Sequence, residues 1–260
     1  MNYFFFTFTD EISAEISVPK FRNDGQYAES MHLYGAKVVD NSWFFYSAEV
    51  DESSNFWNIA ATEENRNDIF FIATPEQFAL QSNSESLIYL NDFTKTWPDF
   101  RCNLSIANSQ GGFSSYQSEY PFTMVGKKGS LYSSIATLSN SDAKKNIIFV
   151  RNIYSQPITD KYLAYLYDSC NEKVLNEIEL QTNCSNVIEI SEYSQYFENL
   201  YLYCDGYLGV PIFCSQYSTG SLSFEHTHPP HENVMDSRKY QIVGELKNEL
   251  RKKIAEASLE

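Results

Sequence analysis

The chain lacks the features that mark a membrane protein, a secreted protein or a common enzyme family. No apolar run reaches about 18 residues, so a transmembrane helix is not expected. Residues 1–13 lack a basic segment and a small-residue cleavage site, and we therefore expect no signal peptide. The five cysteines are an odd number and form no CxxC pair, which favours reduced thiols in a cytoplasmic protein. The P-loop, GxGxxG, GxSxG and HExxH patterns are also absent.

Positive charge is scarce as well. The 260 residues include 19 Lys and Arg against 34 Asp and Glu, a formal net charge of −15. The imbalance lies before residue 236, because residues 236–260 contain six basic and five acidic side chains. An acidic body repels phosphate groups, so neither nucleic acid nor an anionic membrane is an expected partner.

Short strand patterns, in contrast, are abundant. With 43% hydrophobic and 16% aromatic residues, the chain can bury a large core. Segments of strand-like composition, such as 2–9, 43–48 and 146–151, are separated by Asn, Asp, Gly and Ser. Turn residues at this spacing predict an all-β protein with a β-sandwich or jelly-roll-like architecture.

No long linker divides these strands. We expect an N-terminal β lobe over 1–140, a C-terminal β-sandwich lobe over 141–235 and a helix over 236–260. One continuous body is an equally open alternative. Segment 162–167 is apolar on both faces, which predicts a central strand covered on both sides. Segment 192–198 is expected to form one helical turn.

Three of the four histidines lie in one segment, residues 220–232. His226 and His228 share one face of an expected strand, about 6–7 Å apart, so their imidazoles can converge on one ion. Two prolines then end the strand, and the turn can bring His231 or Glu232 to the pair. Imidazole with carboxylate suits one divalent transition metal: zinc, iron, nickel or manganese. The alternative is that these histidines are ordinary strand-end residues.

The spacing Gly-x5-His-x-His-x3-Glu, over Gly220, His226, His228 and Glu232, resembles the first motif of the cupin family. In cupins the two histidines and the glutamate are metal ligands on a small β-barrel. The resemblance therefore implies a metal-dependent enzyme acting on a small sugar-like substrate. Two features of the family pattern are missing: the closing glycine, whose place is taken by Lys239, and the second motif.

A segment rich in Ser, Gly and Tyr, residues 109–130, interrupts the strand pattern. Long loops on β scaffolds often carry function. Its aromatic residues are candidates for the wall of a carbohydrate-like ligand site: Phe113, Tyr116, Tyr120 and Phe122. The alternative is that they pack the loop onto the body.

The hydrophobic period changes near the C-terminus. Val243, Leu246, Leu250, Ile254 and Ala257 recur at helical spacing and predict one α-helix. Because this stripe is narrow, we predict that it contacts a second copy of the chain and forms a homo-oligomer. Docking of the helix on its own sheet is the alternative.

Two classes of function follow from these patterns. Residues 146–216 resemble the β-sandwich of sensory-rhodopsin transducer proteins in their strand pattern, with no functional residue carried over. Aromatic richness and the absence of catalytic patterns favour a binding or assembly module that recognises a carbohydrate-like ligand or a protein partner. The alternative is a metal-dependent enzyme at His226 and His228.

Overall fold

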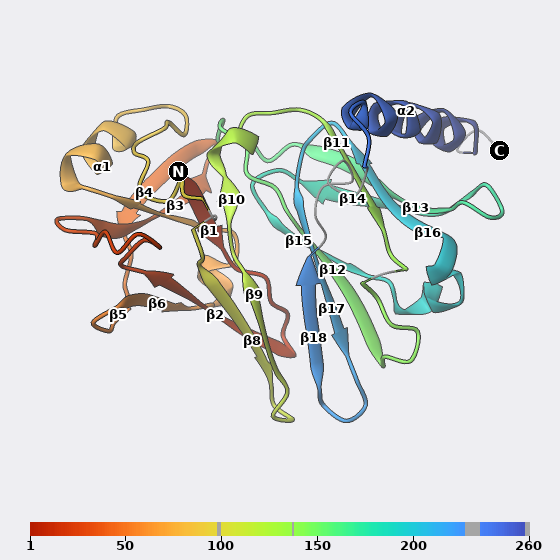
Figure 1. Cartoon of the computed structure of the whole chain (residues 1–260), viewed down its shortest axis with the longest axis horizontal. Helices are drawn as coiled ribbons and strands as arrows, with labels where there is room; N and C mark the ends of the chain where they lie inside the picture. Colours follow the sequence, from red (N-terminus) through yellow and green to blue (C-terminus); the bar gives the residue numbers. More distant parts are fainter. Residues whose placement is uncertain (98–99, 137, 227–234, 258–260) are drawn as a thin grey trace.

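The computed structural model describes residues 1–97, 100–136, 138–226 and 235–257. Antiparallel strands in four sheets are the main regular structure of these residues, and a helix follows the last strand, which confirms the all-β prediction. The sheets pack in pairs, so two β-sandwiches lie side by side (Figure 1). No helix in the described ranges has the length and apolarity needed to cross a bilayer.

The first sandwich consists of two five-stranded sheets. One contains, in spatial order, β10 (Tyr120–Pro121), β1 (Asn2–Phe5), β7 (Ile69–Ala73), β3 (His32–Val39) and β4 (Ser42–Ser47). The other contains β5 (Asp51–Glu52), β6 (Phe56–Ala60), β2 (Ile12–Pro19), β8 (Asn103–Asn108) and β9 (Phe113–Gln117). Two short helices lie between its strands along the chain, η1 (Glu63–Asn65) and α1 (Pro75–Ser82), and a third, η2 (Phe122–Met124), follows β10.

The second sandwich consists of two four-stranded sheets. One contains β11 (Ser130–Ser134), β16 (Leu200–Asp205), β13 (Lys161–Asp168) and β14 (Lys173–Gln181). The other contains β15 (Ser185–Glu189), β12 (Lys145–Arg151), β17 (Val210–Gln216) and β18 (Leu222–His226). The remaining helices are η3 (Ser191–Asn199), which includes the expected turn, and α2 (Lys239–Ala257).

The chain passes from the first sandwich to the second at an earlier residue than the sequence predicts. β10 belongs to the first sandwich and β11 to the second, so the change falls between residues 121 and 130 rather than at 140. The expectation of one long loop over 109–130 is also wrong, because β9, β10 and η2 occupy much of it.

Strand β12 is covered on both faces. Ile148 and Val150 point into the core of the second sandwich, whereas Ile147 and Phe149 join the core that extends into the first. Because successive side chains of a strand point to opposite faces, this one apolar strand contributes residues to both hydrophobic cores. The coverage expected for 162–167 is present in part: β13 is an interior strand, and Tyr167 is buried beneath α2, whereas Leu163 is 43% exposed.

A buried arginine links the two sandwiches. Arg151, at the end of β12, is 1% exposed. Its Nη2 donates to the Asn67 carbonyl oxygen at 2.9 Å and its Nη1 to Ser185 Oγ at 3.3 Å. Ser185 Oγ in turn donates to the Phe6 carbonyl oxygen at 2.8 Å. Burial lowers the pKa of Arg151 to about 10, so the guanidinium remains charged and its hydrogen bonds are charge-assisted.

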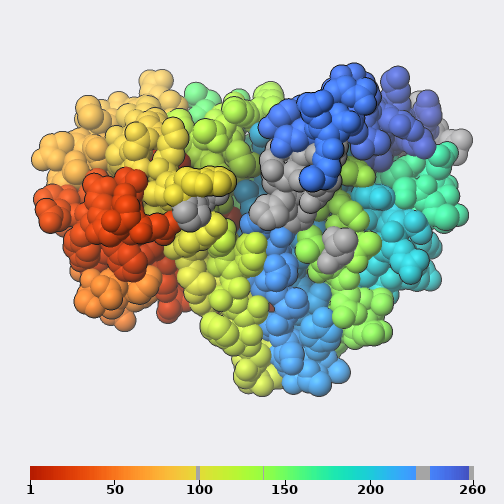
Figure 2. Space-filling view, viewed as in Figure 1, coloured from red at the N-terminus to blue at the C-terminus, as the bar shows by residue number. Residues whose placement is uncertain are grey.

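Two hairpin tips form a second link. The β8–β9 and β17–β18 hairpins lie side by side at the lower edge of the molecule (Figure 2). Asn108 Nδ2 donates to the Gly220 carbonyl oxygen at 2.8 Å. A Cβ on Gly112 would lie 1.9 Å from that same oxygen, so this contact requires glycine.

Helix α2 covers the outer face of the β11–β16–β13–β14 sheet (Figure 1). Val243, Leu250 and Ile254 are buried, and the latter two pack against Tyr167 and Tyr203. Docking on its own sheet therefore accounts for three residues of the predicted stripe.

Cationic side chains reinforce this docking. Lys247 Nζ donates to the Ser130 carbonyl oxygen at 2.6 Å, and Arg251 Nε lies 2.8 Å from Asp205 Oδ2. Leu246 is 50% exposed. Association of two chains through the outer side of α2 stays a prediction.

Candidate functional site

The four aromatic residues predicted to line a ligand site do not form one wall. Phe113 is 63% exposed on β9, and the Tyr116 ring meets that of His226 edge-on at 4.5 Å. Tyr120 is fully buried, and burial raises its pKa to about 12. Phe122 packs against the rings of two tyrosines. The structure therefore leaves Phe113 as the most exposed ring of this set.

The predicted metal site falls largely outside the described residues. His226 is the last residue of β18, and His228, His231 and Glu232 lie in the segment that the structure does not describe. Within the described ranges, no three His, Cys, Asp or Glu side chains are grouped to hold a metal ion. That search does not include three of the four proposed ligands, so the metal site stays a hypothesis.

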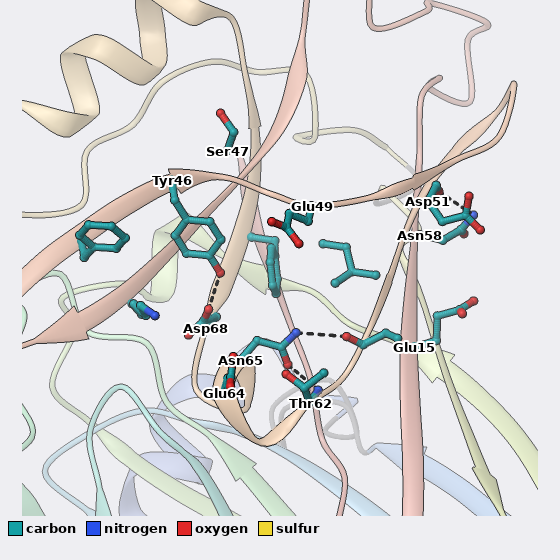
Figure 3. A pocket seen from close by; sticks show the side chains of 15 residues that line it. Glu15, Tyr46, Ser47, Glu49, Asp51, Asn58, Thr62, Glu64, Asn65 and Asp68 are labelled. Atoms are coloured by element: carbon teal, nitrogen blue, oxygen red, sulfur yellow. Dashed lines mark hydrogen bonds between the residues drawn. The ribbon is translucent and has the colours of Figure 1, made fainter.

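A cleft in the first sandwich is the main candidate for a binding site. It has a volume of about 820 Å³ and lies between the edge of one sheet, at β4, and β5 and β6 of the other (Figure 3). Residues from both sheets line it, together with η1. The site therefore exists only when the two sheets have packed.

The floor of the cleft is a tyrosine–carboxylate pair. The Tyr46 hydroxyl donates to Asp68 Oδ2 (Figure 3), and Asp68 is 4% exposed. Burial raises the pKa of Asp68, whereas the hydrogen bond from Tyr46 and the charges of Lys37 and Arg151 act in the opposite direction. The hydrogen bond from the Tyr46 hydroxyl therefore stabilises the charged form of the buried Asp68 carboxylate.

A glycine positions the tyrosine ring. Tyr46 on β4 is the cross-strand partner of Gly35 on β3. A Cβ on Gly35 would lie 2.3 Å from Tyr46 Cζ, so the ring can cross β3 only because this residue has no side chain. The ring of Phe44 stacks beside that of Tyr46, with centroids 6.2 Å apart, and is 53% exposed. Lys37 Nζ lies 5.8 Å from the Phe44 ring centroid and 6.0 Å from that of Tyr46.

The rim of the cleft is acidic. Glu15, Glu49, Asp51 and Glu64 are exposed and surround the opening. Within the described part of the chain, none of these four forms an ion pair with Lys or Arg. With Asp68, the cleft contains five carboxylates against one ammonium group, that of Lys37.

Strand β4 forms one edge of its sheet and therefore has a free side. The β3–β4 hairpin closes with a two-residue turn at Asp40 and Asn41, whose φ values of 49° and 58° are those of a type I′ turn. Ala48 N donates to the Leu33 carbonyl oxygen, which sets the alternation of hydrogen-bonded pairs along the ladder.

By this alternation, the backbone groups of β4 divide into two sets. Ser42, Phe44 and Tyr46 face β3. Trp43, Phe45 and Ser47 direct their N–H and C=O groups away from the sheet. Among the described residues, no backbone group of another segment pairs with this side.

The other edge strands of the described sheets are protected. β5 and β10 have two residues each, β14 and β15 contain charged side chains, and β9 and β18 contact each other. The edge of β11 is partly covered by Lys247 of α2. Charged side chains and proline normally prevent unwanted pairing at an edge strand. Among the edge strands of the described sheets, β4 alone has four aromatic side chains and neither a charged residue nor a proline.

The sequence contained part of the signal for this site. The composition of residues 43–48 predicts a strand, and Ser-Trp-Phe-Phe-Tyr-Ser, residues 42–47, lacks the charge expected of an exposed edge. Its position at an edge, and its neighbours in the cleft, depended on pairings that the sequence did not reveal. Comparison of the chain with protein-family models, with curated proteins and with solved structures gave no match.

Proposed function

We propose that the protein is a β-sandwich binding module that receives an extended segment of a protein partner at the free edge of β4. The observation that supports this proposal is the set of outward-facing backbone groups at Trp43, Phe45 and Ser47. A strand that adds to a sheet edge obtains affinity from main-chain hydrogen bonds and specificity from its alternate side chains. The aromatic side chains of β4 supply apolar contacts on both faces of the added strand.

The energetics suit a reversible partner. Each added backbone hydrogen bond contributes about 0.5–1.5 kcal/mol net, and three outward-facing residues offer several. Cross-strand aromatic contacts add about 0.2–1 kcal/mol each. Ordering an extended segment offsets part of this gain, so we expect weak to moderate affinity.

The experiment uses a neutral probe, the peptide acetyl-Thr-Val-Thr-Val-Thr-Val-Thr-amide. We expect it to bind the wild type and to slow hydrogen exchange at the amides of Phe45 and Ser47. The amides of Phe44 and Tyr46 already bond to β3 and should change little. Ser47→Pro removes an outward N–H and should abolish binding, whereas the matched control Ser47→Ala retains the N–H and should bind normally.

Equal binding to the two Ser47 variants, or protection of the wrong set of amides, contradicts the proposal. A second candidate function is a carbohydrate-like ligand in the cleft, favoured by the exposed Phe44 ring beside hydrogen-bonding carboxylates. A sugar whose binding is lost in Phe44→Ala, but not in Phe113→Ala, would favour this second candidate.

A further inference from the structure

We infer that the segment received at β4 is basic, with Lys or Arg at alternate positions. This inference rests on the proposed pairing at β4 and specifies the chemistry of the partner. Its basis is the position of the acidic cleft relative to the free edge.

The side chains of an added strand alternate between two faces. On one face of β4, Phe44 and Tyr46 line the cleft together with Lys37 of β3. A strand added beyond β4 therefore directs every second side chain over the same opening. The rim carboxylates of Glu49 and Asp51 follow β4 directly in the chain and lie at this opening (Figure 3).

These groups favour a cation. The rim carboxylates Glu15, Glu49, Asp51 and Glu64 have no ion-pair partner in the described part of the chain and can each receive one. The aromatic rings attract a cation as well, as the position of Lys37 over Phe44 and Tyr46 already demonstrates.

The opposite face of β4 favours apolar residues. Trp43 and Phe45 are partly buried against the core of the first sandwich. An added strand places its intervening side chains beside these two rings. The preferred segment therefore alternates basic and apolar residues.

A second copy of the chain is a poor occupant of this edge. Pairing of β4 with its equivalent would bring two clefts together, each with five carboxylates and one ammonium group. Each body also has a formal net charge of −15, so repulsion opposes this contact. The partner is therefore a different, basic segment.

The test compares three peptides with acetyl and amide ends: Lys-Val-Lys-Val-Lys-Val-Lys, the Thr equivalent and the Glu equivalent. We expect the Lys peptide to bind about tenfold more tightly than the Thr peptide, as two or three exposed ion pairs would allow. The ratio should fall towards one in about 1 M salt, where the Debye length is about 3 Å. The Glu peptide should bind more weakly than either.

Variants locate the effect. The ratio of Lys-peptide to Thr-peptide affinity should fall from about ten to roughly three in Glu49→Gln/Asp51→Asn, because two of the four rim carboxylates are removed. It should persist in Glu29→Gln/Glu85→Gln, which removes the same charge from exposed residues that do not line the cleft. A ratio that changes equally in both double variants reflects net charge alone and overturns the inference.

The outcomes separate this inference from the proposed function. If the Lys and Thr peptides bind equally and both depend on Ser47, the edge pairing stands and the basic partner is wrong. If no peptide protects the amides of Phe45 and Ser47, the proposed function itself fails. A wild-type dimer that Ser47→Pro dissociates identifies a second copy as the occupant and also overturns the inference.

Discussion

Tyr46→Phe removes one hydroxyl from the floor of the cleft and leaves the ring in place over Gly35. The lost hydrogen bond is donated to Asp68, which is 4% exposed and thus has little access to water. A hydrogen bond to a charged group contributes about 1.5–3 kcal/mol. We therefore expect the free energy of unfolding at about pH 7 to fall by about 1.5–3 kcal/mol, and Tm to fall by roughly 3–10 °C for a chain of this size.

The matched control is Tyr89→Phe. Tyr89 also donates to an aspartate, Asp92, but the tyrosine is 43% exposed and the carboxylate is at the surface. Water can replace the lost hydroxyl there, so this variant should cost less than about 0.5 kcal/mol. Burial is the main difference between the two pairs, and the exposed Tyr89 hydroxyl also accepts a hydrogen bond from the N-terminal ammonium group at 3.4 Å.

The effect of Tyr46→Phe should also depend on pH. Burial raises the pKa of Asp68 above its ordinary value of 3.8, and the Tyr46 hydrogen bond limits that rise. A raised carboxyl pKa costs stability above the folded pKa, and this cost disappears as pH falls below the unfolded value. Removing the hydroxyl raises the pKa of Asp68 further. The difference between wild type and variant should therefore be largest near neutral pH and should shrink towards about pH 4.

Urea denaturation at several pH values measures the stability difference, and an NMR titration of the Asp68 carboxyl group measures its pKa directly. A variant no less stable than Tyr89→Phe would refute the importance of burial. A stability difference that does not vary with pH would refute the assignment of the effect to Asp68.

Two further predictions concern packing and association. Gly35→Ala should lower the free energy of unfolding by about 1–3 kcal/mol, because the new Cβ would displace the Tyr46 ring. Gly244→Ala, in α2 with no atom near the added Cβ, should instead stabilise the protein by up to about 1 kcal/mol, and denaturation of both variants tests this contrast. Leu246→Asp should lower the mass measured by light scattering towards that of a monomer, because this exposed residue is the part of the apolar stripe left for a second chain. A wild type that is monomeric at high concentration contradicts the last prediction.

Local patterns predicted much of the secondary structure. The strand at residues 43–48 and the C-terminal helix both rely on neighbouring residues alone. Helix α1 was not predicted, although Thr74, Pro75 and Gln77 form a recognisable start signal: a capping box with proline at the first helical positions.

The side of α2 that would be buried was decided by the sheet beneath it. The narrow stripe suggested a partner chain, but Tyr167 and Tyr203 provide a wide aromatic surface for Leu250 and Ile254. Lys247 also donates a hydrogen bond to this sheet, and Arg251 and Lys253 form ion pairs with Asp205 and Glu172. Helical spacing identifies which residues share a face, and it does not identify what covers that face.

The sequence by itself determined that this chain forms short antiparallel strands with an acidic surface and a final helix. It did so because side-chain alternation, turn chemistry and charge are properties of neighbouring residues. The tertiary structure decided which strand is left at an edge and which carboxylates meet beside it. Glu15, Tyr46 and Asp68 lie on separate segments of the chain, and they share one cleft because non-local strand pairing and packing of the two sheets bring them together.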